Sequence, residues 1–125
     1  MMDTLVSLRR ETTCAVVIAD EDGLITYVNE RFERDLGWNR EEILGRPLLT
    51  IIPPRLHDAH HLGFSRFLLT GVSTLLDRPL TLSVMTREGK EVRAEHRILA
   101  EQVQGHWVFG ATIRRLDAEE EPWDA

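Results

Sequence analysis

The sequence contains a single cysteine and no long apolar segment, and each scarcity excludes a class of protein. Cys14 alone cannot form an internal disulfide, and it suits a reducing compartment. No apolar run approaches the roughly 20 residues that a membrane-spanning helix needs. Residues 1–10 also lack the apolar stretch of a signal peptide. We therefore expect a cytoplasmic protein that is not inserted in a membrane.

Positive charge is scarce as well. Lys and Arg total 15 against 21 Asp and Glu, which gives a formal net charge of -6 and a pI near 5.3. This balance argues against nucleic acid as a direct partner, because a nucleic-acid-binding surface needs an excess of positive charge. The 125 residues, 42% hydrophobic and 29% charged, are enough for one folded domain with one core.

The first part of the chain predicts a short helix and a β-hairpin. Within residues 3–11, Leu5 and Leu8 form one thin apolar edge, which suits packing on a neighbour or on a second copy of the chain. Residues 1–11 are therefore interpreted as a helical cap. Two strand-like runs, 14–19 and 24–28, flank a turn and predict a hairpin.

Three helices are expected next. Asn29 is a typical N-cap for a helix that ends at Gly37. Residues 39–45 begin with a capping-box pattern and stop at a glycine. In residues 53–71, two prolines start a longer helix and a glycine ends it. These signals predict helices that are separated by short turns.

Alternating sequences predict three further strands, at residues 78–85, 92–99 and 107–113. The acidic residues 117–125 are expected to form a tail or linker. The order of elements predicts an α+β domain, in which short helices pack on one face of a five-stranded antiparallel sheet.

The long helix places a histidine among apolar side chains. Leu56, His60, Phe64 and Phe67 follow one another at intervals of four, four and three residues, so they share one helical face. A histidine within such a stripe needs a partner, which is either a hydrogen-bonding group of the core or a metal.

His96 is predicted to face the same core from the sheet. The strand at residues 91–99 alternates, and His96 falls on its apolar face, which is expected to look toward the helix with His60. Two histidines could then ligate one haem iron. Alternatively, each is a hydrogen-bonded core histidine, or His96 is a polar gate over a bound gas.

Several motifs of one family occur along the chain. They are Asp22, Leu24-Ile25, Val28-Asn29, Phe32, Gly37, Glu41 to Gly45, Ile52-Pro53 and Arg87 to Lys90. With these motifs, residues 12–116 resemble a PAS domain, a sensory module of signalling proteins. The resemblance implies that the chain is not itself an enzyme, and that it passes a ligand or redox state to an effector such as the histidine kinase of a two-component system.

The long helix resembles more closely the haem-binding helix of rhizobial oxygen-sensing PAS kinases. The matching residues are Ile52 to Arg55, His60, Arg66-Phe67 and Thr70-Gly71. This implies haem b with its iron on His60, sensing a gas or a redox state. Leu80 stands where those sensors have a distal arginine, which puts specificity for oxygen in doubt.

The expected cofactor site combines both histidines with apolar residues of the helix and the sheet. Arg66 could meet a haem propionate or an acidic ligand, and it could equally be a surface arginine. The remaining residues expected around the pocket are Leu56, Phe64, Phe67, Leu76, Leu80 and Leu82.

His57 and His61 imitate the spacing of an H-E-x-x-H zinc site, with Asp58 in place of the glutamate. Asp58 is one methylene shorter and no third ligand is evident, which favours surface histidines over a zinc hydrolase. The leading hypothesis is a haem-dependent sensor. The alternative is a PAS module that binds another small molecule, or none, and acts by homodimerisation through its N-terminal helix and sheet.

Overall fold

The computed structural model describes residues 5–71 and 78–116. Its centre is one antiparallel sheet with the strand order β2-β1-β5-β4-β3. This confirms the predicted α+β class and the five-stranded sheet. The strands are β1 (Ala15–Asp20), β2 (Ile25–Val28), β3 (Pro79–Met85), β4 (Glu91–Val103) and β5 (His106–Arg115).

The β4–β5 hairpin is longer than the sequence predicts. Its two loop residues, Gln104 and Gly105, have φ angles of 53° and 82°. Positive φ at both positions is the geometry of a two-residue turn whose twist matches that of the flanking strands. Pairing therefore continues to Val103 and His106, beside the turn.

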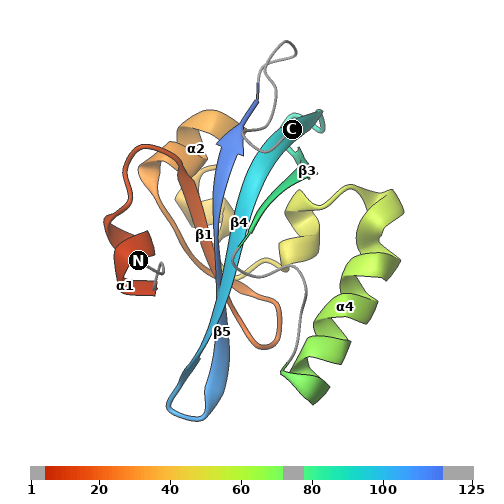
Figure 1. Ribbon diagram of the computed structural model, residues 1–125. Helices are drawn as coiled ribbons and strands as arrows, with labels where there is room; N and C mark the ends of the chain where they lie inside the picture. The colour runs from red at the N-terminus through yellow and green to blue at the C-terminus, as the bar shows by residue number, and fades with distance from the viewer. Residues whose placement is uncertain (1–4, 72–77, 117–125) are drawn as a thin grey trace.

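Short helices connect the two halves of the sheet (Figure 1). Local sequence explains where several of them begin and end: α2 and α3 start at Asn29 and Asn39, prolines precede or open the 3-10 turns, and glycines follow α2 and α4. Gly37 and Gly71, for example, close two of them with φ angles of 82° and 69°. The elements are α1 (Leu5–Arg10), α2 (Glu30–Leu36), α3 (Arg40–Ile43), the 3-10 turns η1 (Leu48–Ile51) and η2 (Pro54–Leu56), and α4 (His57–Thr70).

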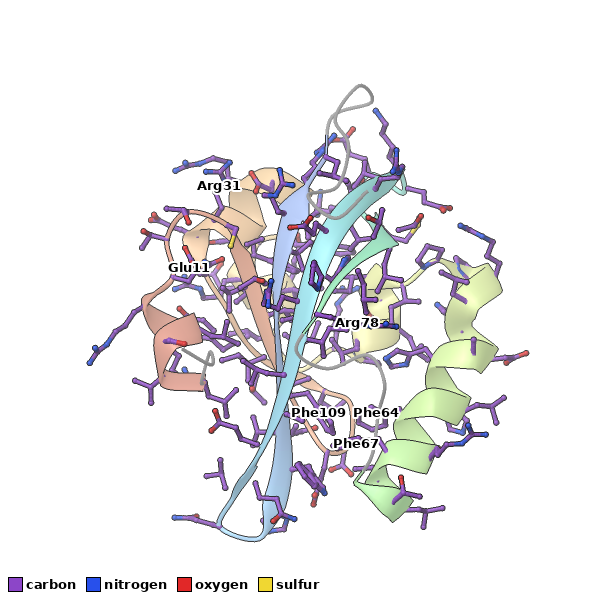
Figure 2. All side chains as sticks on the ribbon, in the orientation of Figure 1. Glu11, Arg31, Phe64, Phe67, Arg78 and Phe109 are labelled. Carbon is purple, nitrogen blue, oxygen red and sulfur yellow. The ribbon has the colours of Figure 1, made fainter. Side chains whose placement is uncertain are left out.

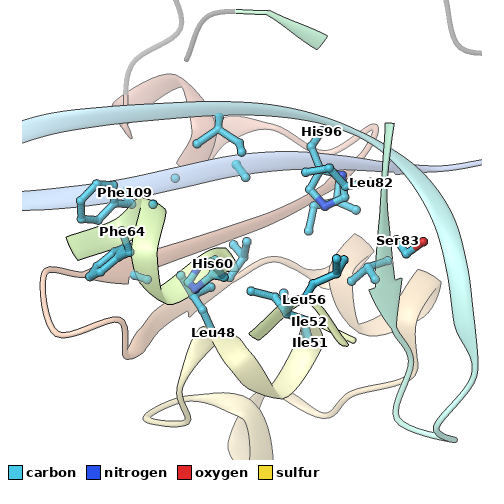
Figure 3. Close-up of a pocket in the computed structure, with 18 of the residues that line it drawn as sticks. Leu48, Ile51, Ile52, Leu56, His60, Phe64, Leu82, Ser83, His96 and Phe109 are labelled. Carbon is cyan, nitrogen blue, oxygen red and sulfur yellow. The ribbon is translucent and has the colours of Figure 1, made fainter. Parts of the chain in front are cut away.

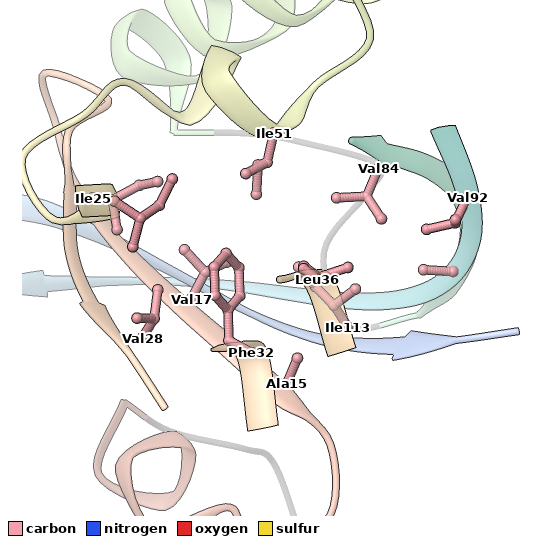
Figure 4. Packing of buried hydrophobic residues seen from close by; sticks show 12 residues of the cluster. Ala15, Val17, Ile25, Val28, Phe32, Leu36, Ile51, Val84, Val92 and Ile113 are labelled. Carbon is pink, nitrogen blue, oxygen red and sulfur yellow. The ribbon is translucent and has the colours of Figure 1, made fainter. Parts of the chain in front are cut away.

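The main core lies between the sheet and the helices α2 and α3 with η1 (Figure 4). Phe32 and Leu36 from α2 are almost fully buried, and they pack with Val17 of β1 and Ile113 of β5. The helix α4 lies on the same side of the sheet, farther along it.

The helix α1 covers the opposite face of the sheet (Figure 1). Leu8 is 2% exposed and packs with Val16, Ile18 and Leu99, while Leu5 contacts the same cluster. The leucine edge that we expected to be too thin for a core thus belongs to a second, smaller one. It is covered by the chain's own sheet because alternate residues of β1 point to opposite faces.

Helices in the described ranges 5–71 and 78–116 are too short or too polar to span a membrane.

Candidate functional site

Phe64 and Phe67, in the second half of α4, lie against Phe109 of β5 (Figure 2). The ring of Phe109 lies 4.9 Å from that of Phe64 and 5.3 Å from that of Phe67, and Trp107 lies 4.7 Å from Phe67. Such tilted and edge-on contacts stabilise a pair beyond its buried area. They anchor α4 with its apolar stripe facing the sheet, as the helical spacing predicts.

Between α4 and the sheet lies a cavity of about 370 Å³, within the range of small-molecule sites. Figure 3 shows His60 entering it from the helix and His96 from the sheet. The other lining residues are Val17, Ala19, Leu48, Ile51, Ile52, Leu56, Ala59, Gly63, Phe64, Phe67, Leu82, Ser83, Val84, Ile98, Phe109, Gly110, Ala111 and Ile113.

His60 is half-buried, and its ring stacks on Phe64 with the ring centres 5.8 Å apart. Within the part of the chain that the structure describes, the ring forms no hydrogen bond. Burial lowers the pKa of His60 below its usual value, and His57 and His61 nearby lower it further. His60 therefore presents a neutral imidazole to the cavity at neutral pH.

His96 lies in the opposite wall and is only 9% exposed. Its Nδ1 lies 3.1 Å from the carbonyl oxygen of Ala94, two residues back on the same strand. Burial lowers the pKa of His96, and the hydrogen bond to Ala94 opposes this only in part. The second imidazole of the cavity is therefore also neutral, and its ring is held by the backbone of β4.

The structure brings together most of the expected site residues. The residues that line the cavity as expected are Leu56, His60, Phe64, Phe67, Leu82 and His96. Arg66 is exposed and lies outside the lining. Leu80 pairs with His96 across β3 and β4, yet it is also outside the lining. Leu76 lies outside the described residues.

One wall of the cavity, formed by η1 and the residue after it, was not predicted from the sequence. Leu48, Ile51 and Ile52 line it, and they come from an apolar run just before two prolines. That apolar run was the sequence feature from which their burial at the site could have been predicted. Phe109 of β5, which was not among the expected site residues, also lines the cavity.

His57 and His61, whose spacing imitates a zinc site, have different surroundings in the structure. The Nε2 of His57 lies 2.7 Å from the carbonyl oxygen of Ile52, where it ties α4 to the preceding turn. His61 is exposed. Among the residues that the structure describes, no three His, Cys, Asp or Glu side chains are grouped to hold a metal ion.

The family model described as PAS fold matches residues 1–71. An uncharacterized protein of Azorhizobium caulinodans is 34% identical to the chain over 103 residues. That match covers 82% of the chain but only 14% of the relative's length. The chain thus corresponds to a small part of the curated relative it matches.

Solved PAS structures share the fold. The PAS domain of an HTR-like protein from Haloarcula marismortui is 27% identical, with a TM-score of 0.67 over 90% of this chain and 88% of that one. The RpfR quorum-sensing receptor PAS domain of Cronobacter turicensis, in complex with C12:0, is 21% identical, with a TM-score of 0.63 over 83% and 95%. The LOV domain of the Erythrobacter litoralis EL346 blue-light activated histidine kinase is 16% identical, with a TM-score of 0.61 over 85% and 98%.

Proposed function

The chain belongs to the PAS family, and from this premise we propose that it is a sensory domain whose cavity binds a small hydrophobic molecule. Binding of this molecule changes the domain, and the change is transmitted to an effector, such as a histidine kinase, elsewhere in a longer protein. The chain itself, residues 12–116 with their helical cap, is the sensor and not the enzyme. Residues 117–125 are proposed to link the domain to that effector. The domain is proposed to lie in the cytoplasm.

The observation that carries this proposal is the cavity itself. This hollow of about 370 Å³ is partly open to solvent and has aliphatic and aromatic walls. Its size, its concave shape and its few polar side chains are those of a small-molecule site. The bound C12:0 of the Cronobacter turicensis domain shows that one PAS domain of similar fold accepts a hydrophobic chain.

The position of Gly110 supports a route for the signal. Gly110 lies in β5 and lines the cavity on one face of the sheet. On the other face, the space beside its Cα is taken by Leu8 and Leu5 of α1. A small displacement of β5 by a ligand would therefore reach α1 directly, because only a glycine backbone separates them.

Nile red, a neutral dye that fluoresces in apolar surroundings, tests the proposal. We expect saturable binding of one dye to the wild-type chain and weaker binding in Gly63→Phe, which adds a ring at the exposed edge of the cavity. Gly63 suits this test because it lines the cavity, is exposed, and has open space where a Cβ would stand. The matched control is Leu62→Phe on the solvent side of α4, where Leu62 is 67% exposed. Dye binding that both variants retain equally would contradict the proposal.

Haem held by His60 is the second candidate, and the unbonded neutral ring of His60 favours it. The residues present suit iron ligation: His60 would hold the iron, His96 in the opposite wall could be a second ligand, and Arg66, exposed on the same helix as His60, could meet a propionate. When bound, haem would supply reversible gas binding or a one-electron redox change. The rest of the lining would hold the macrocycle by apolar contact.

Haemin titration followed by absorption tests this candidate. We expect a Soret band that is lost in His60→Ala and kept in His61→Ala, since His61 is exposed on the same helix. A chain that takes up no haemin, or that binds it equally in His60→Ala, would remove the haem candidate. The broader proposal of a hydrophobic ligand would still stand.

A homodimer through α1 and the sheet is also proposed, as part of a module that relays its signal by association. The observation that favours it is Val6, which is 61% exposed on the outer side of α1 while Leu8 faces inward.

A further inference from the structure

The cavity lining carries no formal charge. Among the described residues that line it there is no Lys, Arg, Asp or Glu, and its polar side chains are Ser83, His60 and His96. Arg66, the arginine of α4, is exposed and outside the lining. An unpaired carboxylate or phosphate enclosed here would lose its hydration without gaining a counter-charge, which costs several kcal/mol. The enclosed part of a ligand is therefore expected to be neutral.

The hydrogen bond between His96 and the backbone determines which ring nitrogen carries the proton, and hence which one can accept a hydrogen bond from a ligand. The carbonyl oxygen of Ala94, 3.1 Å from Nδ1, can only accept, so Nδ1 carries the proton. In a neutral ring the other nitrogen, Nε2, then holds a free lone pair. Within the described residues Nε2 has no partner, although the side chain is nine-tenths buried.

Nε2 can be reached from the cavity, because His96 lines it and Nε2 is not one of the fully enclosed polar atoms that lack a partner. The residues paired with His96 on the adjacent strands, Leu80 of β3 and Ile113 of β5, have no donor in their side chains. A donor on a molecule in the cavity would therefore form a hydrogen bond to Nε2 that these neighbours do not supply.

We propose that the cavity selects a lipophilic molecule whose enclosed polar group is neutral and donates a hydrogen bond to Nε2 of His96. Primary or secondary amides and alcohols meet this description, whereas fatty-acid anions do not. His60, across the cavity and without a hydrogen bond in the described part of the chain, is placed to contact the same polar group. This inference rests on the proposed ligand-binding function and names the ligand class for it.

Three probes of equal chain length separate charge from donor capacity. They are dodecanamide, which is neutral and donates; methyl dodecanoate, which is neutral and only accepts; and dodecanoate, which is charged and only accepts. Each would compete with Nile red at about pH 8, where the acid is ionised and both imidazoles are neutral. We expect dodecanamide to displace the dye at a concentration about fivefold to tenfold lower than the ester, as one hydrogen bond predicts. Dodecanoate should be the weakest competitor.

His96→Leu supplies the matched variant. It should abolish the advantage of the amide over the ester, measured as the ratio of their competing concentrations within the same variant. His61→Leu on the surface should leave that ratio as in the wild type. An independent readout that does not depend on a variant is the ¹⁵N shift of His96 Nε2 in the wild-type chain. It should move when dodecanamide binds and stay nearly constant with the ester.

Each outcome decides a separate claim. Dodecanoate that competes as well as the amide, or an amide advantage that survives in His96→Leu, would overturn the inference and leave the proposed function in place. If the dye binds but none of the three probes displaces it, the inference is likewise overturned and the proposed function stands. A chain that binds neither the dye nor any probe would overturn both.

Discussion

Asn29 is the residue that joins the first hairpin to the helices. Its Oδ1 accepts hydrogen bonds from the backbone N–H groups of Val16 and Phe32, at 3.0 and 2.9 Å. Its Nδ2 donates to the carbonyl oxygens of Glu11 and Cys14, both at 3.0 Å. The side chain is thus an N-cap for α2 and a buried connection to β1, which is more than the N-cap that the sequence predicts.

Asn29→Ala should therefore lower the free energy of unfolding by about 2–4 kcal/mol, because a cap is lost and buried backbone groups are left unpaired. Urea denaturation measures it. The control is Asn39→Ala at the exposed start of α3, which should cost less than about 1 kcal/mol. Equal losses in the two variants would show that burial of the Asn29 network adds nothing.

The histidines should separate in pKa according to their surroundings. Burial lowers the pKa of His60 and of His96, whereas the hydrogen bond that Nδ1 of His106 donates to Glu21, at 2.7 Å, raises the pKa of His106. An NMR titration should show His106 protonating first as the pH falls. Glu21→Gln should return His106 toward the usual value of about 6.5 without moving the other two. A His96 that titrates at or above the usual value would contradict its burial.

The lowered pKa of His96 makes the stability of the fold depend on pH. The folded pKa of His96 lies below its unfolded value, so the unfolded chain binds the proton first. The contribution of His96 to stability is therefore fully present above about pH 6.5 and is lost as the pH falls from there toward the folded pKa. His106, whose folded pKa is raised, acts in the opposite direction.

Among the elements, α1 packs directly against the backbone of β5 at Gly110. Gly110 of β5 has no room for a side chain, because a Cβ would overlap Leu8 and crowd Leu5. We expect Gly110→Ala to destabilise the chain by about 1–3 kcal/mol through overpacking. In a Leu8→Ala background the same substitution should cost much less, and a double-mutant cycle on unfolding free energies measures that coupling. Additive effects would mean that α1 does not press on Gly110.

Element positions were predictable where local chemistry specifies them. Asn29, the two prolines before α4 and Gly71 mark helix ends, and the turn at residues 104–105 marks a hairpin. The length of β4 was not predictable, because it depends on how far β5 continues to pair with it. The packing of α1 was not predictable either, because a single apolar edge could pack equally well on the chain's own sheet or on a second copy of the chain.

At the scale of the whole molecule, the side of α1 that faces away from the sheet is free for association. Val6→Asp should weaken any self-association without unfolding the chain, because Val6 is 61% exposed. Leu8→Asp should instead unfold or destabilise it, since Leu8 is buried in the second core. Light scattering together with circular dichroism distinguishes these results. A chain whose association state is the same in Val6→Asp as in the wild type would exclude this face of α1 from the dimer.

The two histidines of the cavity were predictable from alternation and helical spacing, because each pattern places its histidine on an apolar face. The cavity between them was not. Its volume depends on how far the contacts of Phe64 and Phe67 with β5 hold α4 from the sheet, and on the wall supplied by η1. Both are properties of packing between distant segments.

The central claim is that a hydrophobic ligand enters this cavity and not the second core under α1. Intermolecular NOEs between dodecanamide and the methyl groups of the chain test it most directly. The account predicts NOEs to Leu48, Leu56 and Ile113, which line the cavity. NOEs confined to Leu8 and Leu99 on the other face of the sheet, or a bound ligand with no NOE to the cavity methyls, would contradict it.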